Sequence, residues 1–391
     1  MSLPLEEKLL RWRRIQEAMG KADLGGMLVF ASQLKTVSIH YLTGYTLLGE
    51  RAFCYLGPEG PPVLFVSEAW DRERAIRETG VDEVRILGKN WPREVADVCR
   101  PWKGRSRTVR LGLVGKEIMG RLDLQALETA LGHETVSASR LLEDLAVVKT
   151  PYELARIREA ARMADAGFVR ALEVMRSGLS DYELVAEIDD AMRHMGATDN
   201  FQMLAVGKQN TGMLLPLNKK IESGDLILFE ITPANGSETY TAQLCRTAIF
   251  GEPPDELLRE KYRLLIEAQE ASLSVIRPGV KISEVARIQN EIIGNAGYSD
   301  YCRPPYMRSR GHGFGLGRIE IEEDSSLEFA EGMSLVVHPN QFLPETGYLA
   351  LGEHVIVTAE GIERLTRTES KIYECADSPV RPREAPPFRV G

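Results

Sequence analysis

Apolar and polar positions in the first third of the chain alternate between short apolar runs, typical of buried strands, and the spacing of surface helices. The chain opens with a helical pattern over residues 5–19, where apolar positions recur among many Arg and Glu residues. Turn residues 57–60 (Gly-Pro-Glu-Gly) predict a hairpin between two apolar runs. Strands are expected at 26–31, 53–56, 62–66, 83–87 and 109–113, and helices at 69–79, 93–99 and 123–131. This alternation predicts an α/β layered domain over residues 1–146.

The pattern changes after residue 147, where longer helical stretches flank a pair of strands. Thr150, Pro151 and Glu153 are typical of a helix start, with an N-cap, a proline at the first helical position and a capping-box glutamate. Helices are expected from this start to about 176, and at 178–196, 254–275 and 282–297, with two strands joined by a turn within 224–251. We therefore predict an α+β protein of two domains. The second spans residues 147–376 with helices on an antiparallel sheet, and a Pro/Arg-rich tail, 377–391, should be loosely held.

Composition narrows the classes of partner. The formal net charge of −9 argues against a nucleic acid or an anionic membrane as partner. No apolar run approaches the length that spans a membrane, and the N-terminus lacks the pattern of a signal peptide. The five cysteines form no CxxC pair, which predicts reduced thiols and a cytoplasmic protein. No GxGxxG loop is present, so the sequence gives no sign of a dinucleotide cofactor.

The strand pair within residues 224–251 carries polar groups where a core is expected. Glu230 interrupts the apolar run 226–231, and a lone carboxylate in a buried strand is unfavourable unless it is paired, hydrogen-bonded or used in function. The second strand, expected over 240–250, carries Gln243 and Arg246. Cys245 shares a face with Gln243 and is expected to be inert packing. The polar groups form either a satisfied internal network or a functional site.

Several motifs occur in an order that resembles one known family. Residues 224–251 resemble the pattern GD-apolar-apolar-D-x-G followed by Y-x-S-D-x-T-R-T. Further matches are GHGFGLGRIE at 311–320 to G-H-G-I-G-L-x-x-H-E, EGMSLVVHP at 331–339 to E/P-G-M-V-x-x-x-E-P, GEHVIVT at 352–358 to E-D-x-V-L-V-T, and HYLTGY at 40–45 to Y-L-T-G-[FY]. The chain thus resembles the pita-bread family of methionine aminopeptidase, aminopeptidase P, prolidase and creatinase. The resemblance covers nearly the whole chain, and it implies a creatinase-like N-terminal domain followed by a pita-bread catalytic domain.

The resemblance implies a site for two divalent metals, held by two Asp, one His and two Glu. Their positions are taken here by Glu230, Gln243, His312, His338 and either Gly352 or, if one residue is skipped, Glu353. Two close cations need anionic oxygens between them, and Gln243 with Gly352 removes both bridging carboxylates. We therefore expect no dinuclear centre and, most simply, no cofactor. A single Zn, Mn or Fe ion on Glu230, His312 and His338 is the alternative.

The residues that remain predict acid–base chemistry. A histidine beside a carboxylate is an oriented proton-transfer group, so we predict that His312 or His338 activates water, with Glu230 and Glu353 completing the catalytic set. The predicted substrate-binding residues are Arg310, whose fork suits a carboxylate, with Tyr240, Gln243 and His354.

The predicted function is that of a metal-independent hydrolase of the creatinase and aminopeptidase P class. It would cleave an amide-like C–N bond in a small polar compound or short peptide. The resemblance to this family implies a homodimer. Creatinase itself works without metal, but the position of its histidine base is Leu215 here, so creatine is not expected. The alternatives are a peptidase of the Xaa-Pro type with one metal, a lyase that uses the same base, and a pita-bread domain that binds peptides without catalysis.

Overall fold

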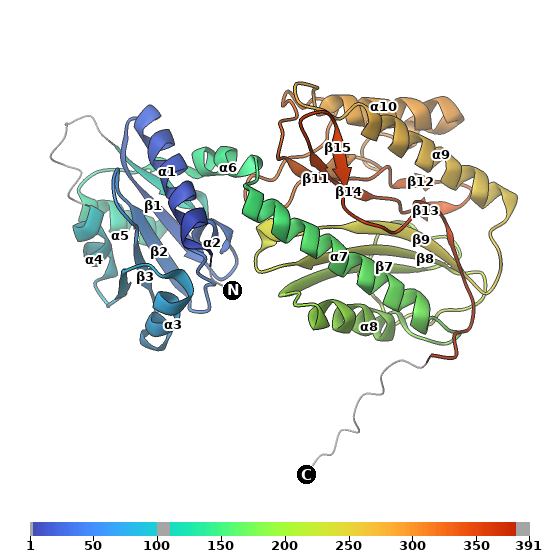
Figure 1. Ribbon diagram of the computed structural model, residues 1–391, viewed down its shortest axis with the longest axis horizontal. Helices are drawn as coiled ribbons and strands as arrows, with labels where there is room; N and C mark the ends of the chain where they lie inside the picture. Colours follow the sequence, from blue (N-terminus) through green and yellow to red (C-terminus); the bar gives the residue numbers. More distant parts are fainter. Residues whose placement is uncertain (1–2, 100–109, 381–391) are drawn as a thin grey trace, which may run out of the picture. The chain divides into compact units, whose positions relative to one another are not determined.

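A computed structural model describes residues 3–99 and 110–380 of the chain, which divides into two compact units, Met1–Val147 and Val148–Gly391 (Figure 1). No helix among the described residues is long and apolar enough to cross a membrane.

Unit 1 is built on a six-stranded sheet with the order β4-β3-β2-β1-β5-β6. Its strands are β1 (Leu24–Ser32), β2 (Arg51–Leu56), β3 (Val63–Val66), β4 (Glu83–Ile86), β5 (Arg110–Val114) and β6 (Val136–Ser137). Its helices are α1 (Leu5–Lys21), α2 (Val37–Thr43), α3 (Ala69–Thr79), α4 (Trp91–Cys99), α5 (Arg121–Leu131) and α6 (Ser139–Val147). β2 runs antiparallel to β1 and β3, whereas β5 runs parallel to β1. The predicted α/β layered domain is confirmed, with an apolar core between the sheet and α4 and α5.

Two helices of unit 1 were not predicted, α2 and α6. The HYLTGY motif lies on α2, which ends at Gly44 in the left-handed conformation with φ 77°. Glycine adopts that conformation without a steric penalty, so this position stops the helix.

Unit 2 combines long helices with two four-stranded sheets. The helices are α7 (Pro151–Val174), α8 (Asp181–His194), α9 (Glu256–Ser274) and α10 (Ser283–Ile293). One sheet has the order β16-β9-β8-β7, the other the order β10-β11-β14-β15, and β12 and β13 form a separate pair. The strands are β7 (Asp199–Gly207), β8 (Leu226–Ala234), β9 (Leu244–Phe250), β10 (Gly311–His312), β11 (Ser334–Val337), β12 (Gln341–Leu343), β13 (Gly347–Leu349), β14 (Glu353–Val357), β15 (Ile362–Arg364) and β16 (Tyr373–Cys375).

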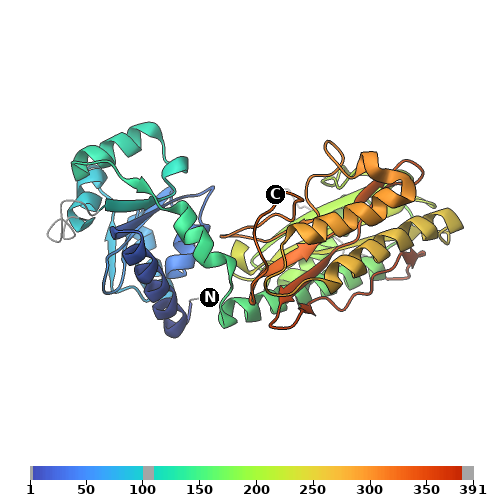
Figure 2. The ribbon, with the colours of Figure 1, turned by 90° about the horizontal axis from the view of Figure 1, so that it is seen from above.

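The helices of unit 2 pack in pairs. α7 and α8 lie together on the β7–β9 sheet, where apolar residues of both helices share one core with β8 and β9 (Figure 1). α9 and α10 run side by side (Figure 2). The predicted capping box at the start of α7 is present, because the Thr150 hydroxyl accepts from the Glu153 amide and the Glu153 carboxylate accepts from the Thr150 amide.

Two local expectations for unit 2 were wrong. The second strand of the central hairpin starts at Leu244 rather than at residue 240, because residues 238–240 form a 3₁₀ turn. The first residues of the predicted loose tail are held against the end of α7. The Asp377 carboxylate accepts from the Ser177 amide at 2.7 Å, and the Ser378 amide donates to the Met175 carbonyl at 3.0 Å. The rest of that tail, 381–391, lies outside the described residues.

Candidate active site

The register of β8 and β9 brings the polar groups of the central hairpin to one face. Glu230 lies directly opposite Cys245. Two residues along each strand, the side-chain amide of Gln243 donates to the Thr232 hydroxyl at 3.2 Å. Because side chains alternate along strands, these four residues share a face. Gln243 is only 2% exposed, and its Oε1 has no hydrogen-bond partner among the described residues.

The buried carboxylate of Glu230 has few hydrogen bonds or nearby charges to offset its burial. The thiol of Cys245 lies 3.9 Å from its Oε2, which is a weak contact. Burial raises the pKa of Glu230 from its ordinary value to about 7. Burial also raises the pKa of the Cys245 thiol, which is fully enclosed. Cys245 is therefore a protonated packing residue, as the sequence predicted.

The structure decides whether Gly352 or Glu353, the first residue of β14, faces the site. Gly352 and Cys245 exchange backbone hydrogen bonds of 3.0 and 3.3 Å. A Cβ atom on Gly352 would lie 2.9 Å from Cys245 Sγ and 3.1 Å from His338 Cβ. Gly352 therefore faces Cys245 and His338 at the position where the family pattern has its last glutamate, and these two side chains fill the place of a Cβ atom.

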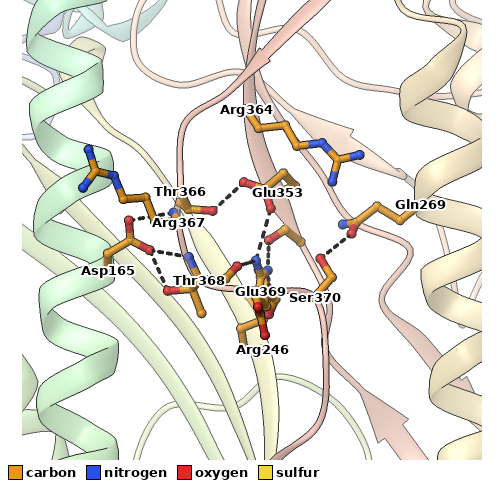
Figure 3. Close-up of polar contacts among 12 residues, drawn as sticks. Asp165, Arg246, Gln269, Glu353, Arg364, Thr366, Arg367, Thr368, Glu369 and Ser370 are labelled. Atoms are coloured by element: carbon orange, nitrogen blue, oxygen red, sulfur yellow. Dashed lines mark hydrogen bonds and ion pairs between the residues drawn. The ribbon is translucent and has the colours of Figure 1, made fainter.

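Glu353 consequently faces the other way, and its predicted catalytic role is wrong. Its carboxylate accepts from Arg246 at 3.1 Å and from the Thr366 hydroxyl, within the polar network around Arg246 (Figure 3). Glu353 is 3% exposed and Arg246 is fully buried. This pair is structural.

Two histidines lie near this position, His338 beside Gly352 and His312 against the His338 ring. His312 Nδ1 bonds the Gly313 carbonyl at 3.0 Å. A carbonyl can only accept, so Nδ1 carries the proton and Nε2 is the free acceptor in the neutral ring. The His338 ring stands edge-on to it with centroids 5.4 Å apart, and His338 Nδ1 is buried without a hydrogen-bond partner in the described chain. Burial lowers the pKa of His312 and lowers that of His338 to about 3, so both rings are neutral near pH 7.

Arg310 does not reach the site as predicted. It is 1% exposed, and its guanidinium donates to Asn290 Oδ1 at 2.7 Å, to the Asn340 carbonyl at 3.2 Å and to Gln341 Oε1 at 2.9 Å. A substrate carboxylate would have to displace these partners. The structure therefore gives Arg310 an internal role in joining α10 to β12.

Two more predicted substrate-binding residues are also internal. His354 is 1% exposed. Its Nδ1 accepts from the backbone amide of Gln243 at 3.2 Å, and its Nε2 forms a hydrogen bond with the Ser334 hydroxyl at 2.9 Å. Tyr240 is 2% exposed and stands edge-on to Tyr152, with centroids 5.9 Å apart. His354 holds the Gln243 backbone in place but presents no free nitrogen to a substrate.

Three residues of the site were missed by the sequence reasoning. Tyr348 packs against the cluster around Cys245. Phe314 and Arg318 line a pocket of about 230 Å³ that Thr232 also lines, and the Phe314 ring stands edge-on to the His312 ring with centroids 4.9 Å apart. The segment GHGFGLGRIE already contained the signal for Phe314 and Arg318, because both lie within six residues of His312.

The residues present do not fit the family's metals. The described residues contain no group of three or more His, Cys, Asp or Glu placed to hold an ion. At the two bridging positions, Gln243 is neutral and Gly352 has no side chain. Glu230, His312 and His338 are not assembled as the three ligands of a single ion. We therefore derive no catalytic step from a metal.

Comparisons with known proteins agree with the fold. Residues 155–359 match metallopeptidase family M24, and residues 11–148 match the creatinase/prolidase N-terminal domain. A Xaa-Pro dipeptidase of Pyrococcus furiosus is 27% identical over 344 residues, covering 86% of this chain and 93% of the relative. The solved structure of a Xaa-Pro dipeptidase from Bacillus anthracis superposes with a TM-score of 0.81 at 26% identity, covering 94% of this chain and 99% of that one. A prolidase from Pyrococcus horikoshii gives a TM-score of 0.79 at 23% identity, covering 92% and 99%.

Proposed function

Because the chain belongs to metallopeptidase family M24, a family of hydrolases, we propose that it hydrolyses an amide-like C–N bond in a small polar compound or short peptide, without the family's pair of metal ions. The relatives named Xaa-Pro dipeptidase support a bond of this type. The observation that carries the metal-free part is the loss of both bridging carboxylates, at Gln243 and Gly352, while His312 is kept and is oriented by the Gly313 carbonyl.

In this proposal His312 is the general base. Its Nε2 lone pair takes a proton from water as the water oxygen attacks the carbonyl carbon. The same nitrogen then donates that proton to the leaving nitrogen as the C–N bond breaks. His312 therefore both accepts and donates the proton, and it ends the reaction as it began. His338 would hold the water through Nδ1, which has no hydrogen-bond partner among the residues that the structure describes.

Measurement of bound metal together with turnover tests the proposal. Protein purified without added metal or chelator is analysed for Zn, Mn and Fe per subunit. It is then assayed against Xaa-Pro dipeptides, other dipeptides, N-acyl amino acids and ureido compounds, with EDTA or with Mn²⁺. The variants are His312→Ala, His338→Ala and, as matched control, His194→Ala, whose side chain is 64% exposed on α8.

We expect metal far below one equivalent and turnover that EDTA does not change. His312→Ala should lose about 100-fold or more in kcat, the usual contribution of a general base, whereas His194→Ala should match the parent. About one equivalent of metal, lost in His338→Ala, would overturn the metal-free reaction in favour of a single-metal peptidase. Tight binding of peptides without turnover would favour a non-catalytic binding protein.

A further inference from the structure

Lys149 is a buried cation that contacts the loop following His312. It directly precedes the N-cap residue of α7 and is only 6% exposed. Its Nζ donates a hydrogen bond to the Leu316 carbonyl at 3.2 Å, although the two residues are 167 positions apart in the sequence. Lysine is rarely buried this deeply unless its ammonium group is paired. This contact therefore joins the start of α7 to the loop beside the candidate general base.

The backbone around Lys149 is itself held in place. Its amide donates to the Gly332 carbonyl at 3.0 Å, and the Gly332 amide donates to the Val357 carbonyl at the end of β14 at 2.9 Å. The next residue, Thr150, forms the capping box of α7. The Lys149 side chain thus starts from a fixed backbone, so its Nζ can hold the Leu316 carbonyl in one position.

The loop over residues 313–319 has a flexible composition. It contains glycines at positions 313, 315 and 317, and a glycine backbone can adopt many more conformations than that of other residues. One hydrogen bond closes the loop, from the Gly313 amide to the Ile319 carbonyl at 2.9 Å. We therefore expect contacts from other parts of the chain to select one conformation of this loop.

Two distant parts of the chain make such contacts. The 3₁₀ turn that contains Thr239 packs against Gly315, since a Cβ atom on this glycine would lie 2.5 Å from Thr239 Cα. The other contact is the hydrogen bond from Lys149 to the Leu316 carbonyl, and Leu316 is itself 5% exposed. A hydrogen bond from a charged donor is stronger than one between neutral groups, so Lys149 should contribute substantially to holding the loop.

The same loop orients His312. The Gly313 carbonyl accepts from His312 Nδ1 at 3.0 Å, and the Phe314 ring stands edge-on to the His312 ring. Resting on the proposed function, in which His312 is the general base, we infer that Lys149 is a positioning residue for His312. By holding the Leu316 carbonyl, Lys149 keeps the Gly313 carbonyl against Nδ1. The proton then stays on Nδ1, and the Nε2 lone pair remains available to accept a proton from water.

The tautomer of His312 can be measured by NMR, which tests the inference independently of turnover. Full-length protein with isotope-labelled histidine is studied at pH 8, where the His312 ring is neutral. The signal missing from His312→Ala assigns this residue. The variants are Lys149→Met and Lys149→Arg, with Lys220→Met as the matched control. Lys220 is exposed, and its Nζ also donates to a backbone carbonyl, that of Gly178 at 3.0 Å.

We expect the Nδ1-protonated tautomer of His312 in the parent, in Lys149→Arg and in Lys220→Met, and a mixture of tautomers in Lys149→Met. Turnover of the best substrate should agree. Lys149→Met should lower kcat about 10-fold, the factor that one hydrogen bond from a charged donor contributes, with KM within about 2-fold of the parent value. Lys149→Arg should recover most of the loss in kcat, because a guanidinium can donate to the same carbonyl.

An unchanged His312 tautomer in Lys149→Met would overturn the inference. An equal change in Lys220→Met, or no recovery in Lys149→Arg, would do so as well. Circular dichroism checks the fold of each variant. If Lys149→Met does not fold, Lys149→Gln takes its place with the same expected changes, because glutamine is shorter and uncharged.

The two proposals can fail separately. If the tautomer responds as expected but no C–N substrate is turned over, the proposed function fails and the positioning role of Lys149 stands. If turnover depends on His312 but the tautomer does not depend on Lys149, the proposed function stands and the positioning role is overturned.

Discussion

Glu230 links the stability of the fold to pH. Its pKa is raised from 4.5 to about 7 in the folded protein, so the folded state holds this proton more tightly than the unfolded state does. Between these two values the folded form loses stability as pH rises, because unfolding then releases a proton. The opposite holds for His338 and His354, whose lowered pKa values reduce stability as pH falls below about 6.5.

We therefore expect Glu230→Gln to remove one component of the pH dependence. Relative to the parent, the variant should gain roughly 3 kcal/mol at most in the free energy of unfolding between pH 4.5 and pH 8. Urea unfolding at both pH values measures this difference, and Glu267→Gln, at an exposed position of α9, should show none. If the free energy of unfolding changed with pH by the same amount in Glu230→Gln and in Glu267→Gln, this explanation would be contradicted.

At the residue scale, sequence reasoning found the positions but not all of the orientations. Glu230, Gln243, His312 and His338 could be placed on the family's ligand positions because the motifs that contain them align without a gap. Glu353 could not, because a shift of one residue along a strand sends a side chain to the opposite face. Arg310 was misjudged for a related reason. Its partners come from α10 and from residues 340–341. No local sequence pattern predicts that these two segments come together.

At the scale of elements, the segment 366–370 stabilises the two sheets of unit 2 around Arg246. The guanidinium donates to the carbonyls of Cys245, Gly352, Thr368 and Glu369 and to the Glu353 carboxylate. Asp165 on α7 accepts from the Arg367 and Thr368 amides at 2.9 and 3.1 Å, and Ser370 donates to Gln269 on α9 at 3.1 Å (Figure 3). This irregular segment thus links helices α7 and α9 to β9, which carries Arg246, and to β14, which carries Glu353.

Replacing Arg246 by Met should destabilise unit 2 by about 3–5 kcal/mol, since it leaves the Glu353 carboxylate buried without its cation. All four tryptophans lie within the first 102 residues, so their fluorescence reports on unit 1. We expect the far-ultraviolet circular dichroism midpoint in urea to fall while part of the tryptophan transition stays in place.

Two variants make this prediction specific. Arg158→Met breaks the half-exposed pair with Glu363 and should cost within about 1 kcal/mol. Adding Glu353→Gln to Arg246→Met should recover part of the loss, because the unpaired charge is then gone. Equal losses in Arg158→Met and Arg246→Met would argue against a special role for the buried pair.

At the scale of the whole molecule, the helices and the layers were the most predictable features. Most predicted helices lie within a few residues of those observed, because caps such as Thr150 and glycines such as Gly80 and Gly132 mark their ends. The short strands β10, β12 and β13 have two or three residues each and no periodicity to detect. These short strands form because the longer elements around them hold their backbones in place.

Each unit has its own core, so we expect residues 1–147 to fold when produced alone. The reason is that the strands and helices of this unit share an apolar cluster drawn entirely from its own residues. A cooperative urea transition by tryptophan fluorescence, at a midpoint close to that of the same signal in the full chain, would support this. A fragment without a cooperative transition would contradict it.

The position of the Arg246 partners along the chain also sets an order of events on the ribosome. Unit 1 is complete once residue 147 has emerged, and domains made first generally fold first. Arg246, by contrast, is synthesised 122 residues before Thr368, one of the groups that receive its hydrogen bonds. The second unit must therefore wait, with an uncompensated cation in its central hairpin, until nearly all of the chain is available. Nascent chains halted near residue 360 should accordingly show a protease-resistant first unit and a digestible second one.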